Sequence, residues 1–133
     1  MNRIVPLMLT LAFVLTGCSS TNTNSSENSE NSYRQISQEE AKEMMDQLAD
    51  VVILDVREQD EFDSGHIPGA VLLPVGTITE DSAAAVIPEA DTTVLVYCRS
   101  GNRSKTASDA LVTLGYTQIY EFGGINTWPY DVE

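Results

Sequence analysis

One stretch of this 133-residue chain decides its fold: Thr93-Val94-Leu95-Val96-Tyr97-Cys98-Arg99-Ser100-Gly101-Asn102-Arg103-Ser104. Its first five residues are rich in β-branched side chains, which favours a strand. A short polar loop follows, and apolar residues at helical spacing come after it. That helix should bury Ala107, Ala110, Leu111 and Leu114. A strand that passes through a loop into a helix is the basic unit of α/β folds.

Strands and helices alternate along the rest of the chain. A capping box from Ser37 to Glu40 predicts a helix that runs to about Ala49. Apolar runs predict further strands, and the intervening segments predict short helices. The strands are expected at residues 51–56, 71–73 and 118–122, and the helices at 58–63 and 81–87. This alternation predicts an α/β fold, a small parallel sheet with helices on both faces.

The first 17 residues have the pattern of a signal peptide. Arg3 gives a positive start, and residues 4–15 form an apolar stretch too short to span a bilayer. Leu15-Thr16-Gly17-Cys18 resembles the lipobox of bacterial lipoproteins. The resemblance implies cleavage after Gly17, a lipid anchor on Cys18, and export to a bacterial membrane surface on the periplasmic or outer side. An ordinary secretory signal is the alternative.

Residues 18–35 are expected to form the lipidated cysteine and a disordered tether. The segment is rich in Ser, Asn and Thr. It has too few apolar side chains to offset the entropy cost of ordering. Residues 36–133 then have the right length for a single domain.

The charge distribution points to a small anion as ligand. The net charge is -13, which argues against nucleic acid as a partner. Three of the seven basic residues, Arg99, Arg103 and Lys105, nevertheless lie in one short segment. One histidine and one free cysteine cannot form a metal-ligand set, so neither a metal nor another cofactor is expected. The protein is expected to be a monomer.

Cys98 is the candidate nucleophile. If Cys18 carries lipid, Cys98 has no disulfide partner. A helix N-terminus, loop N–H groups and two nearby cations can lower a thiol pKa from about 8.5 to about 7, which takes about 2 kcal/mol. Considered alone, a cysteine at a strand end is more simply a small buried hydrophobic residue. The polar loop that follows it argues against that alternative.

Five motifs in sequence order resemble those of a single-domain rhodanese. They are Leu54-Asp55-Val56-Arg57-Glu58, Glu61-Phe62, Gly65-His66-Ile67-Pro68-Gly69-Ala70, the segment from Tyr97 to Ser104, and Gly123-Gly124 with Trp128. The resemblance covers essentially all of the chain after the tether. It implies a sulfurtransferase in which the Cys98 thiolate accepts a sulfane sulfur from an anionic donor such as thiosulfate. The resulting persulfide would pass that sulfur to a thiol or to cyanide.

The same resemblance implies which residues bind the donor. The backbone from Arg99 to Ser104 would hold the transferred sulfur, and the side chains of Arg99 and Arg103 would bind the anionic part of the donor. The expected substrate-binding residues are Arg99, Ser100, Gly101, Asn102, Arg103 and Ser104.

Supporting residues are expected on the neighbouring strand. The resemblance implies that Asp55 lies beside the active loop, accepts hydrogen bonds from it and orients Arg57. A surface ion pair in an ordinary strand-end turn is the alternative for these two residues. His66, in a turn, is expected to make structural hydrogen bonds, and Trp128 is expected to pack in the core.

Two other interpretations of the function stay open. Cysteine-dependent phosphatases and arsenate reductases, some of which share the rhodanese fold, usually place an arginine six positions after the cysteine. Here Arg103 lies five positions after Cys98, and the smaller ring fits one sulfur atom better than a tetrahedral phosphate. The other interpretation is a non-enzymatic module at the cell envelope that carries persulfide or docks with an exported partner.

Overall fold

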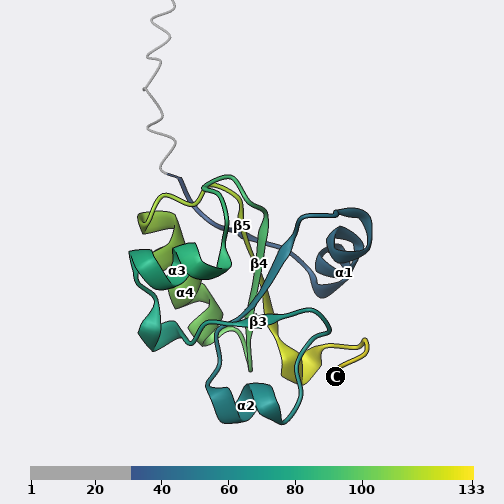
Figure 1. Ribbon diagram of the computed structural model, residues 1–133. Coiled ribbons are helices and arrows are strands. Elements are labelled where there is room, and N and C mark those ends of the chain that lie inside the picture. The colour runs from purple at the N-terminus through teal and green to yellow at the C-terminus, as the bar shows by residue number, and fades with distance from the viewer. Residues whose placement is uncertain (1–30) are drawn as a thin grey trace, which may run out of the picture.

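The computed structural model describes residues 31–133, in which strands and helices alternate along the chain and the strands form one sheet (Figure 1). The strands are β1 (Arg34–Gln35), β2 (Val52–Asp55), β3 (Val71–Leu72), β4 (Val94–Cys98) and β5 (Ile119–Gly124). The helices are α1 (Gln38–Gln47), α2 (Gln59–Asp63), α3 (Glu80–Val86) and α4 (Asn102–Thr113), with short 3-10 turns at Val75–Thr77 and Ile125–Thr127. The predicted alternation is confirmed.

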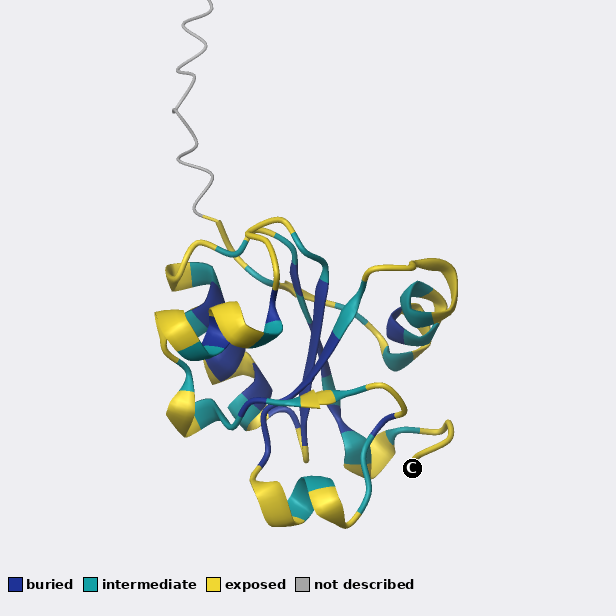
Figure 2. Ribbon diagram, viewed as in Figure 1, coloured by how far each residue is buried: buried dark blue, intermediate teal, exposed yellow. Residues whose placement is uncertain are grey.

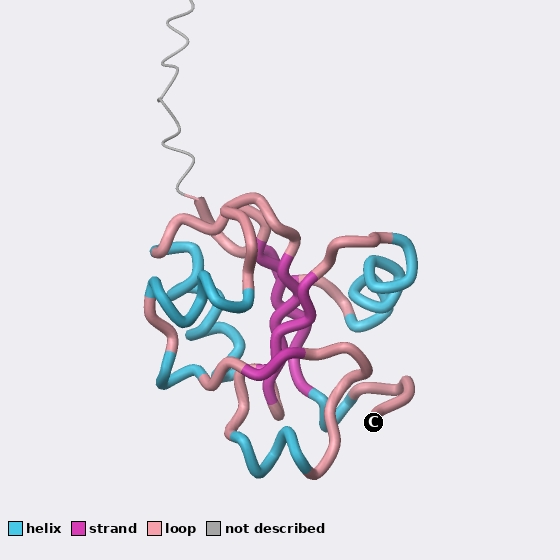
Figure 3. Tube along the Cα trace, viewed as in Figure 1, coloured by secondary structure: helices cyan, strands magenta, loops and turns pink. Residues whose placement is uncertain are grey.

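The sheet is parallel throughout and has the strand order β1-β5-β4-β2-β3. β4 lies in the middle, and all of its residues are buried. Parallel strands end at the same edge of a sheet, so the last residues of β2 and β4, Asp55 and Cys98, lie at one edge. The strands occupy the centre of the molecule with helices on either side, and α2 lies beyond the edge where they end (Figure 3).

Each face of the sheet is covered by helices, as the fold class predicts. On one face, α3 and α4 pack against side chains of β2 and β4, including Leu54, Val94 and Val96. On the other face, α1 packs through Ala41 against a cluster that includes Leu95 and Phe122. Figure 2 shows the buried strands between these more exposed layers. Alternate residues of one strand point to opposite faces, which explains why β4 is apolar along its whole length.

The helix boundaries follow local signals. Ser37 caps α1 through the predicted capping box with Glu40, and the helix ends at Gln47. α4 buries the row Ser104, Ala107, Ser108 and Leu111. Of the other two residues expected on this face, Ala110 is half-buried, and Leu114 is 37% exposed because it lies at the C-cap after the helix ends at Thr113.

The ordered domain begins earlier than predicted. Arg34 and Gln35, assigned to the tether, form β1 and pair with Tyr120 and Glu121 of β5. Backbone hydrogen bonds can hold a two-residue edge strand whose side chains stay exposed, so its composition gives no strand signal. The predicted signal peptide, the lipidated Cys18 and the tether up to residue 30 lie outside the described residues. Between residues 31 and 133, no helix is long and apolar enough to cross a membrane.

Candidate active site

The loop after β4 folds back over its own cysteine. Gly101 adopts a positive φ of 104° directly before α4, and its backbone N–H donates to the Cys98 Sγ at 3.0 Å. A residue with a Cβ rarely adopts this conformation. The Cys98 residue is 1% exposed. The thiol is therefore buried, with its sulfur facing amide groups at the N-terminus of a helix.

Two opposing effects act on the Cys98 thiol. Burial raises its pKa, because a charged thiolate is less well solvated there. Hydrogen bonds with the Ser104 hydroxyl and with the backbone N–H groups of Ser104, Gly101 and Ser100 lower it. The hydrogen bonds outweigh the burial, so the pKa lies below the ordinary value for cysteine. The loop therefore favours the nucleophilic form of the sulfur.

The glycine pair that ends β5, Gly123 and Gly124, lets the backbone approach the loop closely. A Cβ at position 124 would overlap the carbonyl group of Arg99 and the backbone nitrogen of Ser100. The same carbonyl accepts a hydrogen bond from the Asn126 N–H at 3.2 Å. The strand pairing is irregular here, since Cys98 lies opposite Gly124 after a bulge. The segment after β5 thus fixes the position of the cysteine loop.

A buried carboxylate that the sequence did not predict lies behind the loop. Glu121 of β5 is 3% exposed and accepts a hydrogen bond from the Ser104 hydroxyl at 2.6 Å. The same oxygen accepts the Gly123 N–H at 2.9 Å, and the other accepts the Gln35 side chain at 3.3 Å. The Ser104 Oγ also lies 3.5 Å from the Cys98 Sγ. One acidic residue within a mostly apolar strand was the signal for this contact.

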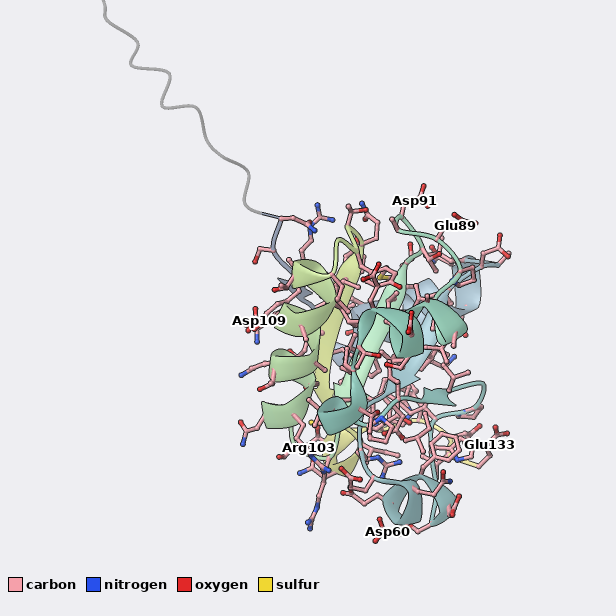
Figure 4. All side chains as sticks on the ribbon, turned by 60° about the vertical axis from the view of Figure 1, so that its left-hand side comes forward. Asp60, Glu89, Asp91, Arg103, Asp109 and Glu133 are labelled. Atoms are coloured by element: carbon pink, nitrogen blue, oxygen red, sulfur yellow. The ribbon has the colours of Figure 1, made fainter. Side chains whose placement is uncertain are left out.

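The two arginines of the loop differ in their surroundings. Arg103 donates two hydrogen bonds to the Glu61 carboxylate of α2, at 2.7 and 2.8 Å. Above all, this side-chain pairing lowers the pKa of Glu61 from 4.5 to about 2. Arg99 is exposed, as are Ser100 and Asn102. Figure 4 shows Arg103 at the end of the molecule where α2, marked by Asp60, also lies.

Asp55 and Arg57 form a buried ion pair. The Asp55 carboxylate is fully buried and accepts hydrogen bonds from the Arg57 guanidinium, the shortest at 2.7 Å. It also accepts the Tyr97 hydroxyl at 2.7 Å, so the hydrogen bonds predicted from the active loop come instead from Tyr97. Burial, and then the bond to Asp55, raise the pKa of Tyr97. Arg57 further donates to the Gly65 carbonyl at 2.7 Å. The alternative of a surface ion pair is wrong.

His66 and Trp128 make structural contacts. The His66 ring stacks on Phe62 with centroids 3.8 Å apart, and its Nδ1 lies 3.0 Å from the Phe62 carbonyl oxygen. Trp128 packs on Phe122 with centroids 5.5 Å apart. Within the described residues, no group of three His, Cys, Asp or Glu side chains is placed to hold a metal ion.

Comparison with known proteins identifies the family. Residues 37–129 match the family model for the rhodanese-like domain. The chain is 38% identical over 97 residues to thiosulfate sulfurtransferase GlpE of Coxiella burnetii. These residues cover 72% of this chain and 87% of that relative. It is 36% identical over 72 residues to thiosulfate sulfurtransferase PspE of Escherichia coli K12, covering 54% and 68%. The solved structure of a rhodanese with anions from E. coli matches with a TM-score of 0.58 at 28% identity, over 62% of this chain and 96% of that one. The chain therefore belongs to the rhodanese-like domain family and is a rhodanese-type sulfurtransferase.

Proposed function

We propose that this protein moves a sulfane sulfur from a small anionic donor such as thiosulfate to a thiol or cyanide, through a persulfide on Cys98. The observation that carries the proposal is the Cys98 sulfur itself, which faces loop amides and has a lowered pKa. A thiolate is the nucleophile that sulfur transfer requires.

Both half-reactions balance without a cofactor. The Cys98 thiolate attacks the outer sulfur of thiosulfate and forms a new S–S bond, while the S–S bond of thiosulfate breaks and sulfite leaves with the electron pair. Cyanide then attacks the outer sulfur of the persulfide, and thiocyanate leaves while the Cys98 thiolate is restored. A thiolate acceptor would react in the same way and leave as a persulfide.

The loop suits a persulfide anion. The N–H groups of Ser100, Gly101 and Ser104 act on the Cys98 sulfur, and converging amides stabilise an anion. Only four residues separate Cys98 from Arg103, so the ring they close is small. That size favours a single transferred sulfur over a phosphoryl group.

Arg103 and Arg99 would bind the oxygen atoms of the donor. Arg103 already holds the planar carboxylate of Glu61 with both ends of its guanidinium fork. A sulfonate group offers oxygens that can compete for the same fork. Arg99 lies exposed at the start of the same loop.

The direct test is the intact mass of the domain after incubation with thiosulfate. We expect a gain of one sulfur atom, absent in the Cys98→Ser variant and lost again when cyanide is added. An unchanged mass with several sulfane donors would contradict the proposal. Hydrolysis of an aryl phosphate without sulfur loading would favour a phosphatase, and loading without turnover would favour a persulfide carrier.

The proposal includes the place of action. The sequence pattern of residues 1–18 supports export, cleavage after Gly17 and a lipid on Cys18, which would anchor a monomeric domain to a membrane on the periplasmic or outer side. In cells fed a labelled fatty acid, the full chain should carry the label in the membrane fraction. The Cys18→Ser variant should lose the label, and an unlabelled full chain would contradict this part of the proposal.

A further inference from the structure

Glu121 has no role in the sulfur-transfer steps above, yet it is among the most buried charged residues of the described domain. It is 3% exposed, and Ser104, between it and Cys98, is fully buried. The Oγ–Oε1 distance of 2.6 Å lies in the range of a hydrogen bond between a hydroxyl and a carboxylate. Burying a carboxylate costs free energy unless it is well paired. Its partners here are a hydroxyl, an amide side chain and a backbone N–H rather than a cation.

The number of protons in this cluster limits which hydrogen bonds can form at the same time. A serine hydroxyl has one proton, which it can donate to one acceptor at a time. When Ser104 donates to Glu121, the sulfur can join the chain only as a thiol that donates to Ser104. When Ser104 donates to a Cys98 thiolate, Glu121 can keep its contact only as a protonated acid that donates to Ser104. Both arrangements contain the same number of protons.

We propose that Cys98, Ser104 and Glu121 form a proton relay in which the buried carboxylate receives the thiol proton through the serine hydroxyl. The Cys98 S–H passes its proton to the Ser104 oxygen while the Ser104 O–H passes its own to Glu121 Oε1. Cys98 becomes a thiolate, Glu121 becomes a carboxylic acid, and Ser104 is unchanged. Glu121 is thus a positioning residue that acts on the sulfur through Ser104. This inference rests on the proposed function for its purpose.

The surroundings allow the relay to reach solvent. Glu121 lines a hollow of about 420 Å³ together with Lys105 and Gly101. Water in this hollow can exchange a proton with the carboxylate while Cys98 stays buried. The other charged or titratable groups that act on this cluster are Arg103, which interacts with Cys98, and Tyr33, which interacts with both Glu121 and Asp109.

The relay predicts an unusual pH profile for thiol alkylation. A lone thiol below its pKa reacts about tenfold faster for each unit of pH, because its thiolate fraction rises by that factor. A shared proton gives a different result: while the pair holds one proton, the thiolate fraction equals the fraction of time that this proton spends on Glu121 and does not change with pH. The rate of alkylation by iodoacetamide in the unmodified domain should therefore be flat over the pH range in which the pair holds one proton, and should rise above that range. A tenfold-per-unit slope throughout would overturn the relay.

The Glu121→Gln variant separates the relay from simple electrostatics. Glutamine keeps an oxygen that can accept from Ser104 and Gly123 but cannot take up the proton. The relay predicts that the flat region disappears and that alkylation within its pH range slows by about tenfold or more. Electrostatics alone predicts the opposite, because removal of a nearby negative charge favours the thiolate. Faster alkylation in this variant would therefore overturn the proposal.

Two further variants complete the experiment. Asp109→Asn removes one negative charge from the exposed side of α4 and should leave the profile unchanged. Ser104→Ala breaks the chain between sulfur and carboxylate and should lose the flat region as Glu121→Gln does. If the variants do not fold, the slope measured on the unmodified domain still decides the question.

Alkylation needs no sulfur donor, so the two proposals can fail separately. A flat profile in a protein that takes up no sulfur would leave the relay standing and contradict the proposed function. Sulfur uptake together with an alkylation rate that rises tenfold per pH unit would support the proposed function and contradict the relay.

Discussion

Two buried polar clusters flank the end of β4, and they differ in how completely their charges are matched. Tyr97 and Cys98 are consecutive, so their side chains point to opposite faces of the sheet. Tyr97 joins Asp55 and Arg57, where the carboxylate meets a cation and a hydroxyl and the guanidinium also reaches the Gly65 carbonyl. Every charge in this cluster has an opposite charge or a donor against it.

The cluster around Cys98 has no such balance. It joins a thiol, a hydroxyl and a carboxylate, none of which is a cation. In the proposed relay its proton can shift among the three groups, whereas in the Asp55 cluster each charged group has an opposite charge against it. We therefore expect the first cluster to stabilise the fold and the second to carry out the proposed chemistry. The following changes test this division, beginning with the largest expected effect.

Replacement of the sulfur should abolish activity without affecting the fold. We expect Cys98→Ser to lose at least about 10³-fold in sulfur transfer, because a hydroxyl is a far weaker nucleophile. The free energy of unfolding, measured in urea, should change by less than about 1 kcal/mol. A much larger loss of stability would mean that Cys98 is chiefly a packing residue.

Removal of the negative charge from the Asp55 cluster should instead lower the stability of the fold. Asp55→Asn leaves the Arg57 guanidinium buried without its carboxylate, which should cost about 3–5 kcal/mol of unfolding free energy. Asp46→Asn is the matched control, because it breaks an exposed ion pair with Lys42 and should cost no more than about 1 kcal/mol. Equal losses in the two variants would show that the Asp55 cluster contributes no more than a surface pair.

Disruption of the close contact between Gly124 and the cysteine loop should lower both the stability of the domain and its rate of persulfide formation. Gly124→Ala places a methyl group against the Arg99 carbonyl, so the loop must shift. We expect a loss of about 1–3 kcal/mol in stability and about a hundredfold in the rate of persulfide formation. Gly76→Ala is the control, since a Cβ there meets no atom within 4 Å. Normal persulfide formation in Gly124→Ala would contradict the close contact.

The ion pair between Glu61 and Arg103 should have the smallest effect, and that effect should disappear in acid. The pKa of Glu61 is lowered to about 2 by Arg103, so its stabilising contribution is complete above pH 4.5 and is lost as the pH falls toward 2. In Glu61→Gln that contribution is missing at every pH. The free energies of unfolding of the two proteins should differ by less than about 1 kcal/mol at neutral pH and converge in acid. A difference that grows in acid would refute the assignment.

The sequence predicted the elements that carry a strong local pattern. The continuous apolar run of β4, the capping box of α1 and the residue order of the loop each depend on neighbours in sequence. The fold class and the position of Cys98 at a strand end followed from them. β1 was missed because two polar residues at a sheet edge are held by backbone pairing alone.

The site residues that were missed depend on contacts between distant segments. Glu121 meets Ser104 only because β5 lies beside β4 and α4 packs across both strands. The role of Gly124 likewise depends on the Arg99 carbonyl, which is far from it in sequence. Glu61 was recognised only as part of a motif, and its pairing with Arg103 required the fold to bring α2 to the loop.

The direction of β1 determines at which end of the domain the preceding chain is attached. Because β1 is parallel to the other strands, the chain enters the domain where the strands begin (Figure 1). The Cys98 loop lies at the opposite end, where the strands end. A support attached through residues before Asn31, whether a chromatography bead or a lipid bilayer, would therefore connect to the domain at the end opposite the Cys98 loop. Reagents arriving from solution would then approach the Cys98 loop from the side away from the point of attachment.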